Sequence, residues 1–301
     1  YAGHETTTRV HLIPRLGHIK LSKLEPADID KAYAAMLAEG TSPSMIQHAH
    51  LRLSKALNDA LRRKLIYRNP CQIVTPPRVT RKELRPPDAD AIHRILEAAK
   101  GKEYYELFFI AFHTGLRRNE TLALQWRDVD LDMGTISVNR NIYHAKGSQT
   151  HYHEPKTAKG RRLVSLTPSS ILVLRALRER QQADAATFSY QVTDDSPVFR
   201  YRDGLRMLPR AVSGAFKKLV RKLGMDGFNF HTTRHAHATL MLRQGVHPSI
   251  VQSRLGHSRV STTLDIYSHI LPGLQEAAAL RFEEGLMAAK KPEQAKEPVT
   301  G

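Results

Sequence analysis

Six side chains spread along this sequence have the chemistry needed to cut a phosphodiester bond without a metal ion. They stand in the order Arg117, Lys156, His231, Arg234, His257 and Tyr267. Guanidinium forks can grip phosphate oxygens, imidazole and ammonium groups can move protons, and a phenol can attack phosphorus and stay attached as an ester. The set is chemically complementary and therefore points to phosphoryl transfer.

Arg117 lies in the segment TGLRRNE, two residues after Gly115. Glycine is well suited to end a helix, so the preceding apolar helix is predicted to stop there and Arg117 to stand at the entry to the next one. Free backbone N–H groups at a helix start favour an anion. Glu120 lies one turn further on, where its carboxylate can orient a guanidinium. Considered alone, Arg117 and Arg118 fit two surface arginines at least as well.

His231 and Arg234 share one helix face in the segment HTTRHAHAT. Their spacing lets one group donate to a phosphate oxygen while the other handles a proton. His231 and His235 are four residues apart, which also fits two zinc ligands, but the sequence lacks the glutamate expected between paired zinc histidines and shows no third ligand. We therefore expect no metal here, and an ordinary polar helix start remains the other interpretation.

His257 and Tyr267 belong to the segment LGHSRVSTTLDIYSH, in which Gly256 is predicted to end a helix. A phenol with an unperturbed pKa of about 10 needs cationic neighbours or a base to attack at neutral pH. The Arg- and His-rich surroundings supply both. Lys156 lies in a loop between two predicted strands, from which its ammonium can protonate a leaving 5′ oxygen. Taken singly, a half-buried structural tyrosine and a plain basic loop are at least as ordinary.

The charge of the chain points to a polyanionic partner. The 301 residues include 46 Lys and Arg against 29 Asp and Glu, a formal net charge of +17, and residues 1–82 alone hold 14 against 6. Nucleic acid is the first expectation and an anionic membrane surface the second. Cys71 is the only cysteine, which excludes an intrachain disulfide and suits a reducing cytosol. No apolar run approaches the ~20 residues of a membrane-spanning helix, so we expect a cytoplasmic protein.

Residues 1–82 are predicted to form a small basic helical domain. The segment 26–39 has a proline in its first turn and apolar residues on one face, and a second helix is predicted from about 42 to 65. Five prolines interleaved with arginines between 69 and 88 predict a semi-extended linker that can lie along a phosphate backbone. We place the domain boundary near residue 83.

The remaining chain, 83–290, is predicted to be mainly α-helical with a small antiparallel sheet near its start. Residues 134–143 alternate in polarity and predict one strand, with 161–166 as its partner. Helices are predicted over 88–100, 103–114, 118–126, 168–184, 209–222, 231–243, 248–255, 261–268 and 273–290. The charged end, 291–301, is expected to be a disordered tail.

Taken together, the segments TGLRRNETLALQWRDVDL, EPKTAKGRRLVSL and the stretch from HTTRHAHAT to DIYSH closely resemble the tyrosine recombinases of the phage integrase family, over roughly residues 85–285. The resemblance implies an α+β catalytic domain that forms a two-domain DNA clamp with a helical core-binding domain over 1–82. By this resemblance, Arg117 and Arg234 match the phosphate-binding arginines, and spacing favours Arg117 over Arg118. Glu120 matches the supporting acidic residue and Lys156 the general acid. His231 and His257 match the two site histidines, and Tyr267 matches the nucleophile.

The resemblance further implies a transesterification like that of type IB enzymes. Tyr267 forms a 3′-phosphotyrosine bond, and a free 5′-hydroxyl reverses the reaction with no metal, ATP or other cofactor. The predicted function is a site-specific recombinase, an integrase of a phage or conjugative mobile element. Two alternatives stay open: a topoisomerase of type IB, which shares the chemistry, and a non-catalytic DNA-binding protein, for which basicity and helices suffice.

The expected partner is double-stranded DNA carrying a core-type recombination site. The basic residues expected to contact it are Arg52, Lys55, Arg62, Arg63, Arg78, Arg81, Lys82, Lys159 and Arg161. The last helix resembles the family's C-terminal helix, which implies a tetramer on DNA, and accessory DNA-bending or directionality proteins are candidate partners. The chain begins at Tyr1 and lacks the family's arm-binding domain, so we expect a fragment whose first core-binding helix begins upstream.

Overall fold

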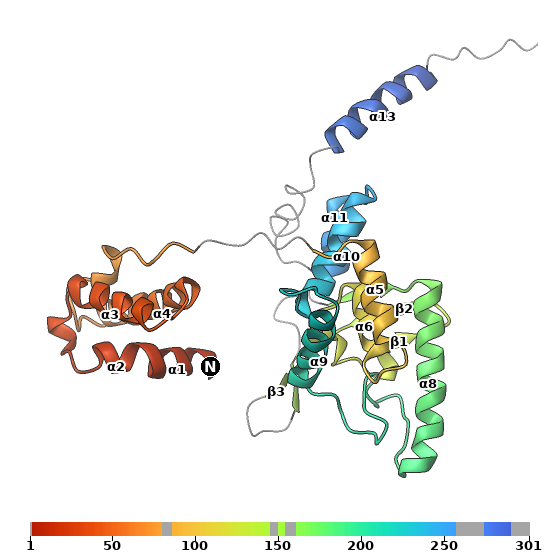
Figure 1. Cartoon of the computed structure of the whole chain (residues 1–301), viewed down its shortest axis with the longest axis horizontal. Helices are drawn as coiled ribbons and strands as arrows, with labels where there is room; N and C mark the ends of the chain where they lie inside the picture. The colour runs from red at the N-terminus through yellow and green to blue at the C-terminus, as the bar shows by residue number, and fades with distance from the viewer. Residues whose placement is uncertain (1, 80–85, 145–149, 154–160, 257–273, 290–301) are drawn as a thin grey trace, which may run out of the picture. The chain divides into compact units, whose positions relative to one another are not determined.

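The computed structural model describes residues 2–79, 86–144, 150–153, 161–256 and 274–289 (Figure 1). The chain divides into two compact units, Tyr1–Glu83 and Leu84–Gly301, and the division lies next to the boundary expected near residue 83. Each unit has its own hydrophobic core, which is the property of a separate domain.

The first unit is built from helices joined by turns. Its elements are α1 (Ala2–Thr7), the π-helix η1 (Thr8–Leu12), α2 (Ile13–Leu16), η2 (Leu21–Lys23), α3 (Pro26–Ala38), α4 (Pro43–Arg62) and η3 (Pro70–Gln72). The Ser42 hydroxyl caps α4 by accepting from the Met45 N–H at 3.3 Å. Ile29 and Met36 of α3 and Ile46 of α4 are fully buried and form the centre of this core.

The structure shows a helical stretch over residues 2–16 that the sequence does not predict. β-branched threonines have low helix propensity, and a turn of π-helix interrupts the stretch. Leu12 and Leu16 are nonetheless 6% and 8% exposed and pack into the same core as Ile29. Tertiary burial therefore outweighs local propensity at this end of the chain.

The second unit is mainly helical with a small antiparallel sheet, as the sequence predicts. Its helical elements are α5 (Ala89–Ala99), α6 (Tyr105–Thr114), α7 (Arg118–Thr121), η4 (Trp126–Asp128), α8 (Pro168–Phe188), α9 (Pro209–Lys222), α10 (His231–Arg243), α11 (Pro248–Leu255) and α13 (Leu274–Ala289). Its strands are β1 (Val129–Asp130), β2 (Thr135–Val138), β3 (Asn141–His144), β4 (Thr150–His153) and β5 (Arg162–Ser165). The predicted helix over 261–268 and the tail 291–301 lie outside the described residues.

Two predicted elements are wrong in extent. The helix expected over 118–126 stops at Thr121, because the chain turns to send Trp126 into the core, where its Nε1 donates to Gln181 Oε1 at 3.0 Å. The strand expected over 134–143 is two strands, β2 and β3, in different sheets. Between them, the side chains of Asn139 and Arg140 donate to Asp128 Oδ1 at 3.1 and 2.8 Å and bend the chain.

The larger sheet has the strand order β1-β2-β5 and is antiparallel throughout. The predicted pairing of 161–166 with the first strand is confirmed, since β2 pairs with β5 in the register Ile136↔Val164. Strands β3 and β4 form a separate two-stranded sheet that is inserted in the chain between β2 and β5.

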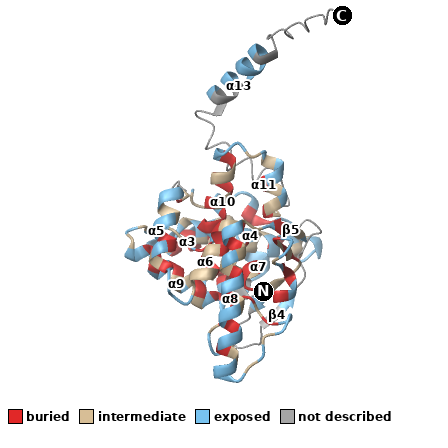
Figure 2. Ribbon diagram, turned by 90° about the vertical axis from the view of Figure 1, so that its right-hand side faces the viewer, coloured by how far each residue is buried: buried red, intermediate tan, exposed pale blue. Residues whose placement is uncertain are grey.

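Helix α6 runs through the core of the second unit, and its C-terminal end leads to the candidate site. The ring of Phe108 packs edge-on against Phe216 of α9, with ring centroids 5.2 Å apart. Figure 2 shows buried residues along both α6 and α10. Gly115, with φ of +66°, ends α6, and a Cβ there would lie 2.5 Å from Leu255 Cδ2 and 2.8 Å from His237 Cδ2. Only glycine therefore lets α10 and α11 approach this end of α6 so closely.

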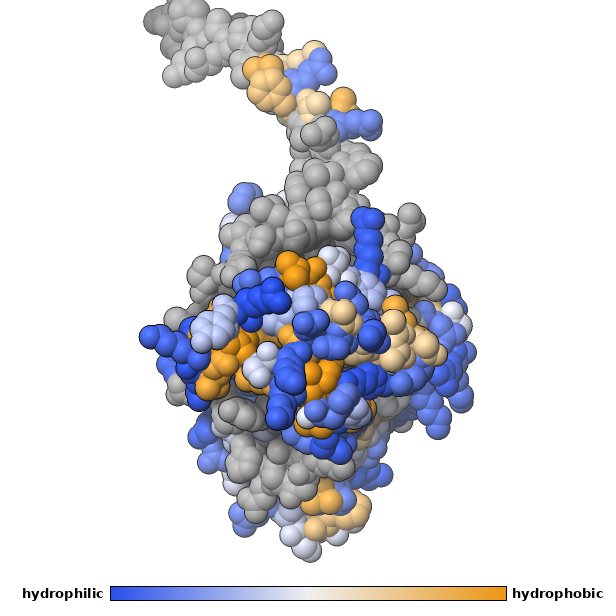
Figure 3. Space-filling model, turned by 90° about the vertical axis from the view of Figure 1, so that its left-hand side faces the viewer, coloured by the Kyte–Doolittle hydropathy of each residue, from blue (hydrophilic) through white to orange (hydrophobic). Residues whose placement is uncertain are grey.

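The surface matches the basic, polar composition of the chain. Figure 3 shows one face on which hydrophilic residues predominate and apolar residues form small separate patches. In the part of the chain that the structure describes, no helix has the length and apolar character needed to cross a membrane.

Candidate active site

Arg117 is the N-cap residue of α7 and is held by the carboxylate of Glu120. The Arg117 backbone N–H donates to Glu120 Oε2 at 2.9 Å, and its Nη1 donates to Oε1 at 2.7 Å. The Glu120 side chain is 3% exposed and that of Arg117 is 40% exposed. The buried carboxylate thus fixes one edge of a guanidinium that stays accessible from outside. Arg118 points elsewhere, since its Nη1 donates to Ser213 of α9 at 2.6 Å.

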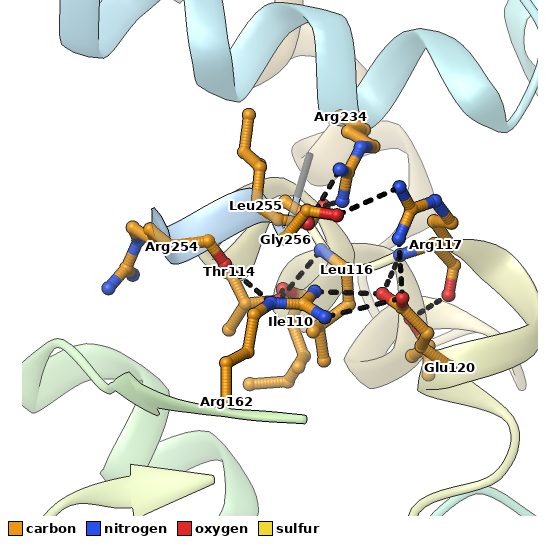
Figure 4. Close-up of polar contacts among 12 residues, drawn as sticks. Ile110, Thr114, Leu116, Arg117, Glu120, Arg162, Arg234, Arg254, Leu255 and Gly256 are labelled. Carbon is orange, nitrogen blue, oxygen red and sulfur yellow. Dashed lines mark hydrogen bonds and ion pairs between the residues drawn. The ribbon is translucent and has the colours of Figure 1, made fainter. Parts of the chain in front are cut away.

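The C-terminal end of α11 brings three arginines together (Figure 4). The carbonyls of Arg254, Leu255 and Gly256 accept hydrogen bonds from Arg162 Nε at 2.7 Å, Arg234 Nη2 at 2.6 Å and Arg117 Nη2 at 3.3 Å, respectively. Carbonyls at this end of a helix have no partner within it and form the negative end of the helix dipole, so they attract cations. The other terminal nitrogen of Arg234, Nη1, donates to the Gly115 carbonyl at 2.9 Å.

Arg162 belongs to the site, although the sequence pattern favours its neighbour Arg161 as the functional arginine. From β5, its Nη2 and Nη1 donate to Oε2 and Oε1 of Glu120 at 2.8 and 3.3 Å, and its side chain is only 6% exposed. The alternation of inward and outward residues along β5 indicates where Arg162 points. Arg162 lies two residues from buried Val164, whereas Leu163 between them is 63% exposed. Arg162 is therefore on the inward face of the strand.

Positive charge exceeds negative charge in this cluster. Burial by itself raises the pKa of Glu120, but the hydrogen bond and charge of Arg162 and the charge of Arg117 outweigh it, so the pKa is lowered. Burial and the charge of Arg117 lower the pKa of Arg234 to about 9, against the opposing effect of Glu120. A cation cluster that depresses the pKa of its own member is an arrangement that a bound anion stabilises.

His231 stands at the exposed first position of α10, beside these cations. Its backbone N–H donates to Asn229 Oδ1 at 2.8 Å, and its ring lies edge-on to that of His235 with centroids 4.7 Å apart. Loss of water around the ring, followed by the charges of His235, Arg234 and Arg117, lowers its pKa to about 4. The imidazole is consequently neutral at pH 7, with a lone pair on one ring nitrogen.

A second layer of side chains supports the end of α11. His237 Nδ1 lies 2.9 Å from the Phe112 carbonyl oxygen, and Arg254 Nε donates to His237 Nε2 at 3.1 Å. Because a carbonyl only accepts, the proton of the neutral ring sits on Nδ1 and leaves Nε2 free to accept from Arg254. Arg254 Nη2 also donates to the His113 carbonyl at 3.2 Å. Burial and then the charge of Arg254 lower the pKa of His237 to about 4.

The structure thus brings together Arg117, Glu120 and Arg234, with His231 close enough for the charges of the two arginines to act on it. Lys156, His257 and Tyr267, together with Arg81, Lys82 and Lys159, lie outside the described residues. In sequence, His257 follows Gly256 directly, and Lys156 falls between β4 and β5.

The predicted DNA-contacting residues that the structure describes are mostly exposed. The exposed ones are Lys55, Arg62, Arg63 and Arg78 in the first unit and Arg161 in the second. Arg62 forms an ion pair with Asp59. Arg52 is half-buried, and its Nη1 is enclosed without a hydrogen-bond partner among the described residues. In the same described part of the chain, no group of three His, Cys, Asp or Glu side chains is arranged to hold a metal ion.

The match to a family model agrees with this geometry. Residues 84–273 match the model of the phage integrase family. A tyrosine recombinase XerC-like protein of Caldanaerobacter subterraneus is 30% identical over 271 residues, which cover 84% of this chain and 69% of that protein. The ICEBs1 integrase of Bacillus subtilis is 26% identical over 266 residues, covering 88% of this chain and 72% of the relative. The chain belongs to the phage integrase family and is a tyrosine-type DNA recombinase.

Solved structures share the fold. The Tn1549 transposon integrase in complex with a circular intermediate DNA superposes with a TM-score of 0.80 at 22% identity, covering 93% of this chain and 92% of that one. A lambda integrase tetramer bound to a Holliday junction gives a TM-score of 0.64 at 17% identity, covering 86% and 71%. At these identities the likeness concerns the fold, and it agrees with the mainly helical architecture described above.

Replacing Glu120 by glutamine should destabilise the second unit. The change leaves the buried guanidinium of Arg162 without its counter-charge, and breaking a buried ion pair costs about 3–5 kcal/mol. Trp126 is the only tryptophan and is 1% exposed in this unit, so its fluorescence during urea unfolding reports the free energy of unfolding there.

Asp132→Asn is the matched control for this measurement. Asp132 pairs with Arg175 at 3.2 Å, but the two side chains are 95% and 52% exposed, and an exposed pair contributes less than about 1 kcal/mol. Equal losses in the two variants would contradict a structural role for the Glu120 carboxylate.

Acidification should weaken the second unit between about pH 6.5 and pH 4. The pKa of His237 is lowered from 6.5 to about 4 in the folded protein. Below pH 6.5 the unfolded chain therefore binds more protons than the folded one, and stability falls as the pH falls. His237→Gln, whose neutral amide keeps one donor group and one acceptor but cannot take up the proton, should reduce the slope of unfolding free energy against pH by up to about 1.4 kcal/mol per pH unit.

The control is His93→Gln, because His93 is exposed on α5. Its slope should equal that of the parent protein. If His237→Gln leaves the slope unchanged as well, the His237 ring is not the group that takes up the proton.

Proposed function

We propose that this enzyme cuts and rejoins DNA at a core site of a mobile element, through a covalent bond between Tyr267 and a 3′ phosphate. One observation carries the proposal: the guanidinium groups of Arg117 and Arg234 meet at the end of α11. That helix end directly precedes His257 in the sequence, and Tyr267 follows within eleven residues of Gly256. The phosphate-binding groups and the nucleophile are thereby close along the chain.

The arginine pair is suited to the scissile phosphate. Nucleophilic attack adds negative charge to the nonbridging oxygens, and fixed cations aimed at them lower the barrier because they need no reorganisation. Each guanidinium has five N–H donors. The Arg117 guanidinium uses Nη1 on Glu120 Oε1 and Nη2 on a long 3.3 Å contact to the Gly256 carbonyl, while its backbone N–H holds Glu120 Oε2. A phosphate oxygen can take the place of that long contact while Glu120 keeps the guanidinium oriented.

Proton transfer falls to the remaining members of the set. In the proposed step, Tyr267 Oη forms a bond to phosphorus as the bond from phosphorus to the 5′ oxygen breaks. His231, whose ring is neutral at pH 7, assists in accepting the phenolic proton, and Lys156 donates a proton to the leaving 5′ oxygen. His257 donates a hydrogen bond to the phosphate. The reverse steps join a new 5′-hydroxyl, so neither ATP nor a metal ion is consumed.

DNA binding and assembly complete the proposal. The first unit, with its exposed Lys55, Arg63 and Arg78, binds core DNA together with the second unit. The lambda integrase tetramer on a Holliday junction supports a tetramer on DNA. Leu280, Phe282 and Leu286 of α13 are 60%, 70% and 56% exposed and offer the apolar contacts that a neighbouring protomer needs. The enzyme acts on DNA in the bacterial cytosol, and accessory DNA-bending or directionality proteins are part of the same proposal.

Tyr267→Phe should abolish covalent attachment to DNA without weakening DNA binding. The test uses 5′-labelled duplexes with a nick near the cleavage position and a randomised core, together with DNA that flanks the coding region. In the parent protein the labelled strand keeps its 3′ phosphate on the tyrosine and migrates with the protein on a denaturing gel. The adduct should form equally well in EDTA, since no step uses a metal.

Tyr190→Phe is the matched control, because its hydroxyl donates to the Gln181 carbonyl at 3.2 Å in another part of the unit. This variant should retain the adduct. A labelled adduct that survives Tyr267→Phe would assign the nucleophile to another residue, and loss of the adduct in EDTA would contradict the metal-free reaction.

A further inference from the structure

Arg162 contacts two parts of the site at once, and these parts come from distant segments of the chain. Its two terminal nitrogens donate to the two oxygens of Glu120, and its Nε donates to the Arg254 carbonyl. Glu120 in turn holds Arg117, and Arg254 is followed by the two carbonyls that hold Arg234 and Arg117. Arg162 is thus bonded directly to Glu120 and to Arg254, and the carbonyls of Leu255 and Gly256 follow Arg254 by one and two residues.

We infer that Arg162 is a positioning residue of the transesterification, which sets the distance between the Arg117–Glu120 pair and the end of α11. The inference rests on the proposed function for its chemistry. Arg162 is 6% exposed, which keeps it from contacting the DNA. It acts on the phosphate through Glu120 and through the backbone at Arg254.

The shape of the guanidinium is what this role requires. A planar fork donates two parallel hydrogen bonds to a carboxylate and presents Nε at a fixed angle to a third acceptor. Lysine keeps the positive charge but carries it as a single point on a flexible stem. Arg162→Lys therefore maintains the charge beside Glu120 and removes the rigid link to the Arg254 carbonyl.

The location of the link explains why its loss affects the reaction more than the binding. The carbonyls of Leu255 and Gly256 fix Arg234 and Arg117, and His257 follows them directly in the sequence. A displacement of about 1 Å in a group that must meet a reacting phosphate can lower the rate 100-fold. DNA affinity depends on many phosphate contacts along both units and changes little when one contact shifts.

The experiment compares the parent protein with Arg162→Lys, Arg162→Gln and the control Arg180→Lys. Arg180 donates to Glu106 at 2.6 Å, a second arginine–carboxylate pair that lies apart from the site. The rate of covalent adduct formation is measured at saturating DNA, and DNA affinity is measured separately by fluorescence anisotropy. We expect Arg162→Lys to lower the rate between about tenfold and 100-fold with affinity within about threefold of the parent, and Arg180→Lys to match the parent in both.

Two results would overturn the inference. In one, Arg162→Lys reacts as fast as the parent, so that the charge alone suffices. In the other, the rate at saturating DNA is unchanged and only the affinity falls, so that Arg162 is a DNA contact.

A readout without DNA separates this inference from the proposed function. If Arg162 and Glu120 act as one unit, the double variant Glu120→Gln with Arg162→Lys loses less melting temperature than the two single losses added together. Additive losses would contradict the link even if the adduct assay succeeds. If the parent forms no adduct while the melting temperatures are non-additive, the proposed function fails and the link stands.

Discussion

The site depends on one set of interactions, the three arginine hydrogen bonds at the C-terminal end of α11. Carbonyls at a helix end are left unpaired by the helix itself and are costly to bury without a partner. Here Arg162, Arg234 and Arg117 satisfy them from β5, from α10 and from the segment between α6 and α7. The contacts that complete the helix end are thus the same contacts that gather the arginines proposed to bind the phosphate. Gly115 makes this possible, since any side chain there would strike Leu255 or His237.

The charges within the arrangement do not balance. Glu120 is the carboxylate that Arg117 and Arg162 share, and its lowered pKa keeps it ionised across the physiological range. It balances less than the full charge of the three arginines. Burial, followed by the charge of Arg117, lowers the pKa of Arg234. At about 9 that pKa still leaves Arg234 charged at neutral pH. In the proposed reaction an entering phosphodiester compensates this surplus of positive charge, so the site is preorganised for an anion.

The sequence predicts the helices of the second unit well, because local signals decide where they begin and end. Glycine stops, proline starts and amphipathic periodicity place α5, α6 and α8 to α11 close to their observed bounds. The choice of Arg117 over Arg118 agrees with the geometry, since Arg118 points to Ser213. The failures have nonlocal causes. Burial of Trp126 shortens α7, the contacts of Asp128 divide the predicted strand, and burial of Leu12 and Leu16 forms an unpredicted helical stretch. Arg162 is missed because its partners, Glu120 and Arg254, are 42 and 92 residues away.

Burial and positive charge together fix the state of the histidines. Burial is the larger cause, and neighbouring charges, those of His235, Arg234 and Arg117 for His231 and that of Arg254 for His237, add to it, so both rings have a pKa of about 4 and are neutral at pH 7. For His237, with both ring nitrogens engaged by Phe112 and Arg254, neutrality secures the support under α11. For His231, at an exposed helix start, neutrality leaves a ring nitrogen able to accept a proton. The same lowered pKa therefore accompanies a structural role for His237 and, in the proposed reaction, a role in proton transfer for the exposed His231.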